Sequence, residues 1–377
     1  MKNIKYNLFF IFISILLLSN KIECIAQKIK LHSIVQQTID DDKKQAIEVW
    51  EKFLYSLDEV ARRELWDANE TNKFGNEYSL FEQAFFQYDR EETLKFFTPY
   101  VLNIEYYNDA LIITTMFSYF PLSISDSSIK NQNPAAIVKI AVIKKNNRYY
   151  LKNVLDYKTE YWRNYLVGHI NYIVHPSIEP LIEDMNSANN FIDSLSNLWC
   201  GHNYKDTINY YMAPNSETIN DIIGFQFAYL GSIGGGQAFV DAKLLFSGRR
   251  NFFYKHELAH IVFGKFQNTM FSEGLATFFG GSNNIDYLVL KNKFLNKIKI
   301  NNYNDLLSFF SHPNSFEYYM IGAIIIEKIF TTKGIDIIKE ISTLEKGTDS
   351  INGAELFINK VKEKLDVDDD AIISLFK

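Results

Sequence analysis

The sequence predicts an α+β protein, in which a small α+β domain precedes a second domain with a small sheet and a mostly helical second half. Three observations support this prediction. Apolar residues recur at steps of three and four between about residues 40 and 67, which is the spacing of an amphipathic helix. Segments rich in Ile, Val, Tyr and Phe follow between residues 101 and 155, as in a series of strands. From Asn251 onward the pattern is helical apart from connecting loops.

Length and composition are consistent with two packed domains. The chain has 377 residues, which is more than one domain of common size contains. Hydrophobic residues make up 47% of the chain, which is enough for two cores and excludes an intrinsically disordered protein. The sequence has no internal repeat and no Gly/Ser linker. We therefore expect an accessory domain over residues 27–165 that is joined directly to a second domain over residues 166–377.

The N-terminus has the order of regions found in a secretory signal peptide. Two lysines precede an apolar stretch over residues 8–18, and Cys24-Ile25-Ala26 precedes a candidate cleavage site before Gln27. The apolar stretch is about half of the roughly 20 residues that a membrane-spanning helix needs. We therefore expect residues 1–26 to be removed on export to the periplasm or the extracellular space, with no stable membrane insertion afterwards.

Charge and cysteine content restrict the partners and the chemistry. The formal net charge is -6, and residues 1–26 contribute +2, so the remaining chain is near -8. This acidity disfavours nucleic acid or an anionic membrane as a partner. Cys200 is the one cysteine left after cleavage, so no intramolecular disulfide forms. Its neighbours Leu198 and Trp199 are apolar, and we expect a buried, unreactive thiol. The sequence does not indicate an oligomeric state.

Residues 27–165 carry no cluster of side chains suited to catalysis. A second helix is expected over Tyr78–Phe97, and Asn146-Asn147 suits a tight hairpin turn because Asn tolerates a positive φ. The expected strands are Val101–Tyr107, Ala110–Tyr119, Ala136–Lys144 and Arg148–Leu155. The pattern loosely resembles cystatin-like folds, and the resemblance implies an accessory role.

Residues 166–377 begin with alternating strands and helices. The expected elements are a strand at His169–Val174, a helix at Ile182–Trp199, a strand at Ile208–Ala213, a helix at Glu217–Ile223 and a strand at Gln237–Phe246. Three glycines, Gly234–Gly236, precede the last strand. They lack the Lys and the helix start that a phosphate-binding loop needs.

One segment has the residue types and the spacing of a zinc site. His256 and His260 lie one helical turn apart within residues 251–264, so both imidazoles project from the same face. Their nitrogens can therefore reach one Zn²⁺ ion at about 2.0–2.1 Å. Glu257 is adjacent to the first ligand, and its carboxylate can approach a water molecule on the metal. Zinc lowers the pKa of such a water to about 7, so that a nearby carboxylate can take its proton.

A catalytic zinc has three protein ligands and one open position, so a third ligand is needed. Glu273 is the candidate. Ser272 before it is expected to cap a helix whose apolar face includes Leu275 and Phe279. Glu273 would then lie in the first turn of a helix that packs against the histidine helix, with its carboxylate facing both imidazoles.

The sequence His-Glu-Leu-Ala-His at residues 256–260, followed by Glu-Gly-Leu-Ala at residues 273–276, resembles the gluzincin peptidases, the clan of thermolysin and the zinc aminopeptidases. The resemblance covers roughly residues 165–377 and implies a zincin-like peptidase domain. It also implies His256, His260 and Glu273 as zinc ligands and Glu257 as general base.

The resemblance further implies an edge strand over Gly234–Phe239, whose main chain pairs with an extended peptide substrate. The implied substrate-binding residues are Gly235, Gly236, Gln237 and Ala238. Tyr319-Met320-Ile321-Gly322 is similar to the Tyr-x-x-Gly of the aminopeptidases, which implies Tyr319 as a hydrogen-bond donor to the tetrahedral oxyanion.

Two departures from the clan bear on the substrate. Twelve residues separate His260 from Glu273, fewer than in thermolysin, so the connection is abbreviated. The aminopeptidases also have a Glu in the edge strand that holds the free amine of the substrate, where this chain has the neutral Gln237. An endopeptidase is therefore favoured over an aminopeptidase.

A different class of function also fits a retained zinc site, namely a secreted binding protein without catalysis. Glu257 separates the two interpretations, because a purely structural site has no use for a carboxylate beside the open position. Structural zinc also prefers four protein ligands with Cys among them, and none is nearby. The sequence therefore predicts a secreted zinc metallopeptidase that acts on a peptide or protein substrate.

Overall fold

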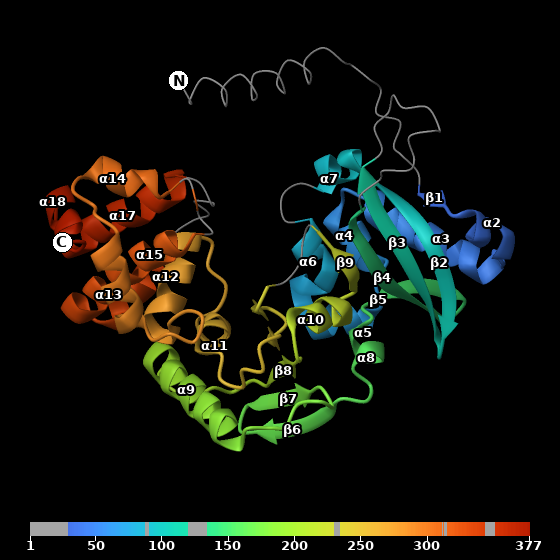
Figure 1. Ribbon diagram of the computed structural model, residues 1–377, viewed down its shortest axis with the longest axis horizontal. Coiled ribbons are helices and arrows are strands. Elements are labelled where there is room, and N and C mark those ends of the chain that lie inside the picture. The colour runs from blue at the N-terminus through green and yellow to red at the C-terminus, as the bar shows by residue number, and fades with distance from the viewer. Residues whose placement is uncertain are drawn as a thin grey trace, which may run out of the picture.

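The computed structural model describes residues 29–86, 90–119, 134–229, 234–310, 312, 315–343 and 351–377. The predicted signal peptide, residues 1–26, lies outside these ranges. The described chain has a mixed α+β fold with sheets and helices in its N-terminal part and a helical second half, as predicted. Figure 1 shows the first sheet at one end of the molecule, the helical half at the other, and the second sheet between them.

The first sheet follows the order β1-β2-β3-β4-β5, and β9 pairs with the N-terminal half of β4. Its strands are β1 (Lys30–Leu31), β2 (Phe97–Tyr107), β3 (Ala110–Tyr119), β4 (Pro134–Lys145), β5 (Arg148–Lys152) and β9 (Phe225–Ala228). The predicted hairpin between β4 and β5 is confirmed, because Asn146 and Asn147 both have positive φ, 50° and 63°. The meander of predicted strands is therefore one antiparallel sheet that β9, from much later in the chain, extends.

Short helices cover the first sheet. They are α2 (Ser33–Thr38), α3 (Asp41–Tyr55), α4 (Glu59–Glu64), α5 (Ala68–Phe74), the 3₁₀ helix η1 (Gly75–Glu77), α6 (Leu80–Phe85), α7 (Arg90–Phe96) and α8 (Leu155–Lys158). The helical pattern over residues 40–67 is thus two helices. Asp58 begins the second one by accepting hydrogen bonds from the Val60 and Ala61 amides. The helix predicted over Tyr78–Phe97 is likewise two helices, α6 and α7.

The second sheet has the order β10-β11-β8-β7-β6. Its strands are β6 (Arg163–Val167), β7 (Ile170–Val174), β8 (Ile208–Met212), β10 (Gly236–Phe239) and β11 (Leu244–Ser247). The single strand predicted over Gln237–Phe246 is wrong, because a turn at residues 240–243 divides it into the antiparallel pair β10 and β11. Lys243 has a positive φ of 50° in this turn, and the Ala242 amide donates a 3.1 Å hydrogen bond to the Glu77 carboxylate.

The remaining elements are helices. They are α9 (Ile182–Cys200), α10 (Ser216–Ile222), α11 (Lys255–Phe263), α12 (Thr269–Gly280), α13 (Tyr287–Lys297), α14 (Tyr303–Ser308), α15 (Phe316–Lys333), α16 (Ile335–Ile341), α17 (Ile351–Leu365) and α18 (Asp369–Ser374). Helices α12 and α15 cross at two glycines, where a Cβ on Gly274 would lie 2.6 Å from the Gly322 backbone. In the described part of the chain, no helix is both long and apolar enough to cross a membrane.

The second sheet separates two hydrophobic cores. Successive residues of a strand point to opposite faces, so in β8 Tyr210 joins the core formed with the C-terminal helices and Tyr211 joins the core formed with the N-terminal part. Leu245 and Phe246 of β11 divide between the two cores in the same way. The predicted domain boundary after residue 165 falls inside β6, and the division into two domains stays a prediction.

Two local predictions are wrong. Cys200 is exposed at the C-terminal end of α9, whose buried face consists instead of residues such as Ala188 and Ile192. Ser272 is not a helix cap, because α12 begins one turn earlier. Asn268 caps it by accepting a hydrogen bond from the Phe271 amide at 3.0 Å. The first error comes from inferring burial from apolar neighbours in sequence, and the second from choosing a helix start by residue type alone.

Candidate metal centre

Two buried tyrosines of the second sheet hold the loop that leads into α11. The Tyr172 hydroxyl of β7 donates to the Phe252 carbonyl at 2.9 Å, and the Tyr210 hydroxyl of β8 donates to the Asn251 carbonyl. The two rings stack with centroids 5.0 Å apart and are excluded from solvent. These contacts fix the start of α11 against the sheet, so the first turn of this helix, which carries His256, has a rigid support.

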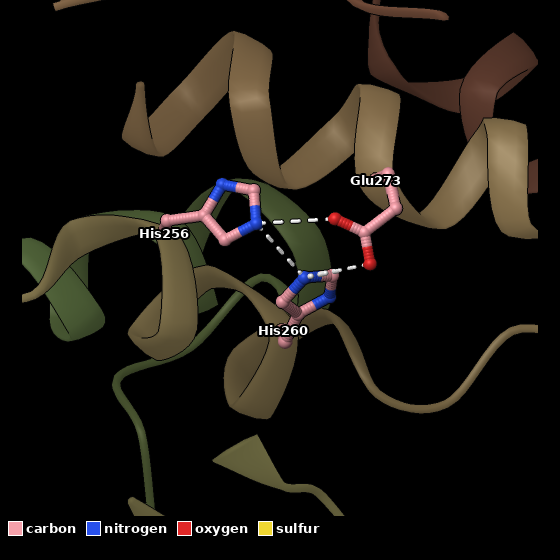
Figure 2. Close-up of side chains that lie close together, drawn as sticks. All are labelled: His256, His260 and Glu273. Carbon is pink, nitrogen blue, oxygen red and sulfur yellow. Dashed lines mark hydrogen bonds and ion pairs between the residues drawn. The ribbon is translucent and has the colours of Figure 1, made fainter. Parts of the chain in front are cut away.

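Three side chains from two helices converge at one point, as Figure 2 shows. His256 and His260 come from α11, and Glu273 comes from the second turn of α12. The two imidazole Nε2 atoms lie 3.2 Å apart. Glu273 places Oε2 3.2 Å from Nε2 of His256 and Oε1 3.5 Å from Nε2 of His260. Within the described residues, this is the group of side chains that could hold a metal ion.

These distances match a tetrahedral zinc site. Ligand atoms about 2.0–2.1 Å from a central zinc in tetrahedral geometry are separated from one another by about 3.3–3.4 Å. The three separations of 3.2, 3.2 and 3.5 Å are close to that length. Two imidazoles and one carboxylate are also ligand types that zinc accepts, and they leave a fourth position open. The side chains present therefore fit a zinc ion.

Contacts behind the ligands orient both rings. His256 Nδ1 lies 2.8 Å from the Gly281 carbonyl, which can only accept, so Nδ1 carries the hydrogen and Nε2 is left for a metal. Ser272 Oγ lies 3.5 Å from His260 Nδ1, a longer contact on the corresponding side of the second ring. The sequence position of Ser272 suggested a helix cap. In the structure its hydroxyl instead contacts the His260 ring.

The charges of His256 and Glu273 stabilise each other. Burial lowers the pKa of His256, but the hydrogen bond and the charge of Glu273 outweigh it and raise that pKa to about 9. Burial raises the pKa of Glu273, but the adjacent His260 and His256 hold it well below its usual range. Glu273 is therefore ionised at neutral pH, and a metal cation has to displace a proton from His256.

The Glu257 side chain extends from α11 to the edge strand β10. Its Oε2 accepts a 2.9 Å hydrogen bond from the Ala238 amide of β10. Glu257 follows His256 in the first turn of α11, so its carboxylate is not part of the converging group. The structure therefore brings the predicted base next to the predicted substrate strand, β10, which is the edge strand of the second sheet among the described residues.

Tyr319 also lies at the centre. Its ring is stacked near His256 with centroids 6.5 Å apart, whereas the neighbouring Tyr318 is 1% exposed in the hydrophobic core. The predicted residues of α11, α12, α15 and β10 are thus gathered in one place.

Comparison with models of protein families and with curated proteins found no match. Any assignment of function therefore depends on the residues and their geometry.

Two side chains beside the edge strand, Tyr254 and Arg249, were not predicted from the sequence. A Cβ on Gly236 would lie 2.0 Å from the Tyr254 ring, and a Cβ on Gly235 would lie 2.1 Å from Arg249 Nε. The glycine run before the strand was the available signal, because consecutive glycines in a strand mark close approach by other groups. Which groups approach depends on the tertiary structure.

Proposed function

We propose that this chain is an exported zinc-dependent peptidase that cuts within peptide chains. One observation carries the proposal. His256, His260 and Glu273 converge, and the neighbouring Glu257 carboxylate lies against the edge strand β10. The resemblance to the gluzincin clan supports a zincin-like fold for residues 166–377. The cystatin-like comparison and the accessory role for residues 27–165 belong to the same proposal.

Each residue has a separate role in the proposed reaction. His256, His260 and Glu273 would hold zinc, which when bound supplies a Lewis acid and lowers the pKa of a coordinated water to about 7. Glu257 accepts a proton from the attacking water and later returns it to the leaving amine. Tyr319 donates a hydrogen bond to the substrate carbonyl oxygen as negative charge develops on it.

The edge strand would bind substrate by strand addition. Gly235, Gly236, Gln237 and Ala238 are the residues proposed to do so. The Ala238 amide donates to Glu257, which supports a peptide path that passes directly beside the base. Gln237 is exposed, and its side-chain amide donates to the Ala238 carbonyl at 3.1 Å. Because this side chain is a neutral amide, it offers no carboxylate to hold a substrate amine. This favours internal cleavage over removal of N-terminal residues.

The proposal is tested by incubating purified residues 27–377 with a peptide library, before and after chelator treatment and after zinc is restored. Cleavage that is lost with the chelator and returns with zinc is expected. Glu183→Gln on the exposed face of α9 is a matched control for Glu257→Gln, because it removes the same charge away from the centre. Stoichiometric zinc without cleavage of any peptide would instead favour a secreted binding protein.

A further inference from the structure

Arg249 covers one face of the edge strand at its start. A Cβ added to Gly235 would lie 2.1 Å from Arg249 Nε and 2.4 Å from its Cζ, and a Cβ added to Gly236 would lie 2.0 Å from the Tyr254 ring. Successive Cβ directions alternate across a strand, so Arg249 and Tyr254 lie on opposite faces of β10. A larger residue at Gly235 would displace the guanidinium.

Gln237 shares the Arg249 face of the strand, because it lies two residues after Gly235. The Gly235 carbonyl accepts from the Gly248 amide at 3.0 Å, so the main-chain groups of alternate residues Gly236 and Ala238 face the open edge. The Ala238 amide does face that way, toward Glu257. A peptide added at the open edge would therefore run past Glu257 and, further along, past Arg249.

Among the described residues, no ion pair neutralises the positive charge of Arg249. Its guanidinium is exposed and donates to the neutral Asn283 amide oxygen at 2.8 Å. Among the described residues, no carboxylate lies within 4 Å of it, whereas Lys255 nearby pairs with Asp286 at 3.1 Å. One neutral hydrogen bond on the surface does not require an arginine. The fork of guanidinium donors instead matches a carboxylate.

We propose that Arg249, together with Gln237, forms a subsite that binds a substrate carboxylate, either an acidic side chain or the C-terminal carboxylate. Gly235 and Ala238 are separated by about 10 Å, at about 3.3 Å per residue of strand. The carboxylate therefore belongs about three residues from the cleaved bond, where Glu257 would take the proton of the attacking water. This inference rests on the proposed function, since it places a peptide along the edge strand. The overall charge of -6 gives no general attraction for acidic peptides, so the preference is local to Arg249.

The test uses pairs of fluorogenic peptides that differ only by Glu or Gln, placed two to four residues from the cleaved bond on either side. A further pair has a free or an amidated C-terminus. We expect the wild-type zinc protein to prefer the carboxylate member about tenfold in kcat/KM at low salt, mainly through KM. Arg249→Met should reduce the ratio to about one, Arg249→Glu should invert it, and Arg250→Met, which removes the adjacent exposed arginine, should leave it unchanged.

A binding measurement separates this inference from the proposed function. Fluorescein-labelled versions of the same pairs are titrated with zinc-loaded Glu257→Gln protein, with and without Arg249→Met. Cleavage that ignores the Glu/Gln difference overturns the subsite and leaves the peptidase standing. Absence of cleavage together with Arg249-dependent binding overturns the peptidase and keeps the subsite. If Arg249→Met also lowers zinc content or the melting temperature, the arginine is structural and the subsite is overturned.

Discussion

Glu77 is expected to hold the turn that carries the edge strand. The residue ends η1 in the N-terminal part and is 6% exposed, and its carboxylate accepts from the amide of Ala242, which is 7% exposed. Glu77→Ala leaves this amide without an acceptor. A buried unpaired amide costs about 1–3 kcal/mol. Adding the lost packing of the side chain, we expect the free energy of unfolding to fall by about 2–3 kcal/mol.

Two further substitutions divide that effect. Glu77→Gln keeps an oxygen acceptor and should cost less than about 1 kcal/mol. Lys265 lies 3.6 Å from the carboxylate but is 58% exposed, so Lys265→Met should cost less than about 0.5 kcal/mol. Urea unfolding measures the free energies, and hydrogen exchange at Ala242 and Ala238 reports the turn directly. The reasoning is refuted if Glu77→Ala costs no more than Lys265→Met, or if Glu77→Gln is as destabilising as Glu77→Ala.

The same group predicts a pH dependence. Burial raises the pKa of Glu77, partly opposed by the hydrogen bond from Ala242. The folded state therefore keeps this proton to a higher pH than the unfolded chain does. Its contribution to stability falls as pH rises from the unfolded carboxyl value, about 4.3, through the raised folded value, and then levels off. Glu77→Gln lacks this decline, so its stability relative to wild type should rise over that window in urea unfolding.

Four other predictions concern the metal centre and the substrate. Residues 27–377 should bind about one zinc per chain, and undiminished zinc in His260→Ala by metal analysis would contradict the ligand set. Apparent zinc affinity should increase by up to about tenfold per pH unit between pH 7 and 8.5, because His256, with a pKa of about 9, must lose a proton when zinc binds. An affinity that does not change with pH in competition titrations would contradict this. Glu257→Gln should keep the metal but lose about 10²–10⁴ in kcat, and turnover at the parent rate would require another base. An N-acetylated peptide should be cut at least as well as its free form, since Gln237 supplies no anion for an amine; strong preference for the free amine would overturn internal cleavage.

Local geometry let the sequence predict the histidine pair. His256 and His260 share a helix face because residues four apart in a helix always do. Asn146 and Asn147 form the hairpin turn because asparagine tolerates a positive φ. The helical second half and the strand-rich N-terminal part follow from periodicity in the same way. Such features depend on neighbours within a few residues, which the sequence states directly.

Tertiary structure decided the rest. The division of Gln237–Phe246 into two strands occurs at a Val-Asp-Ala-Lys turn that has no glycine or asparagine, and its Ala242 amide is satisfied by Glu77 from 165 residues earlier. Tyr318 and Tyr319 are adjacent in sequence, yet the packing of α15 buries one in the core and sets the other beside His256. Arg249 meets Gly235 only because β10 and β11 pair. Each of these contacts joins groups whose separation along the chain carries no information about their distance in space, and only the packed fold sets it.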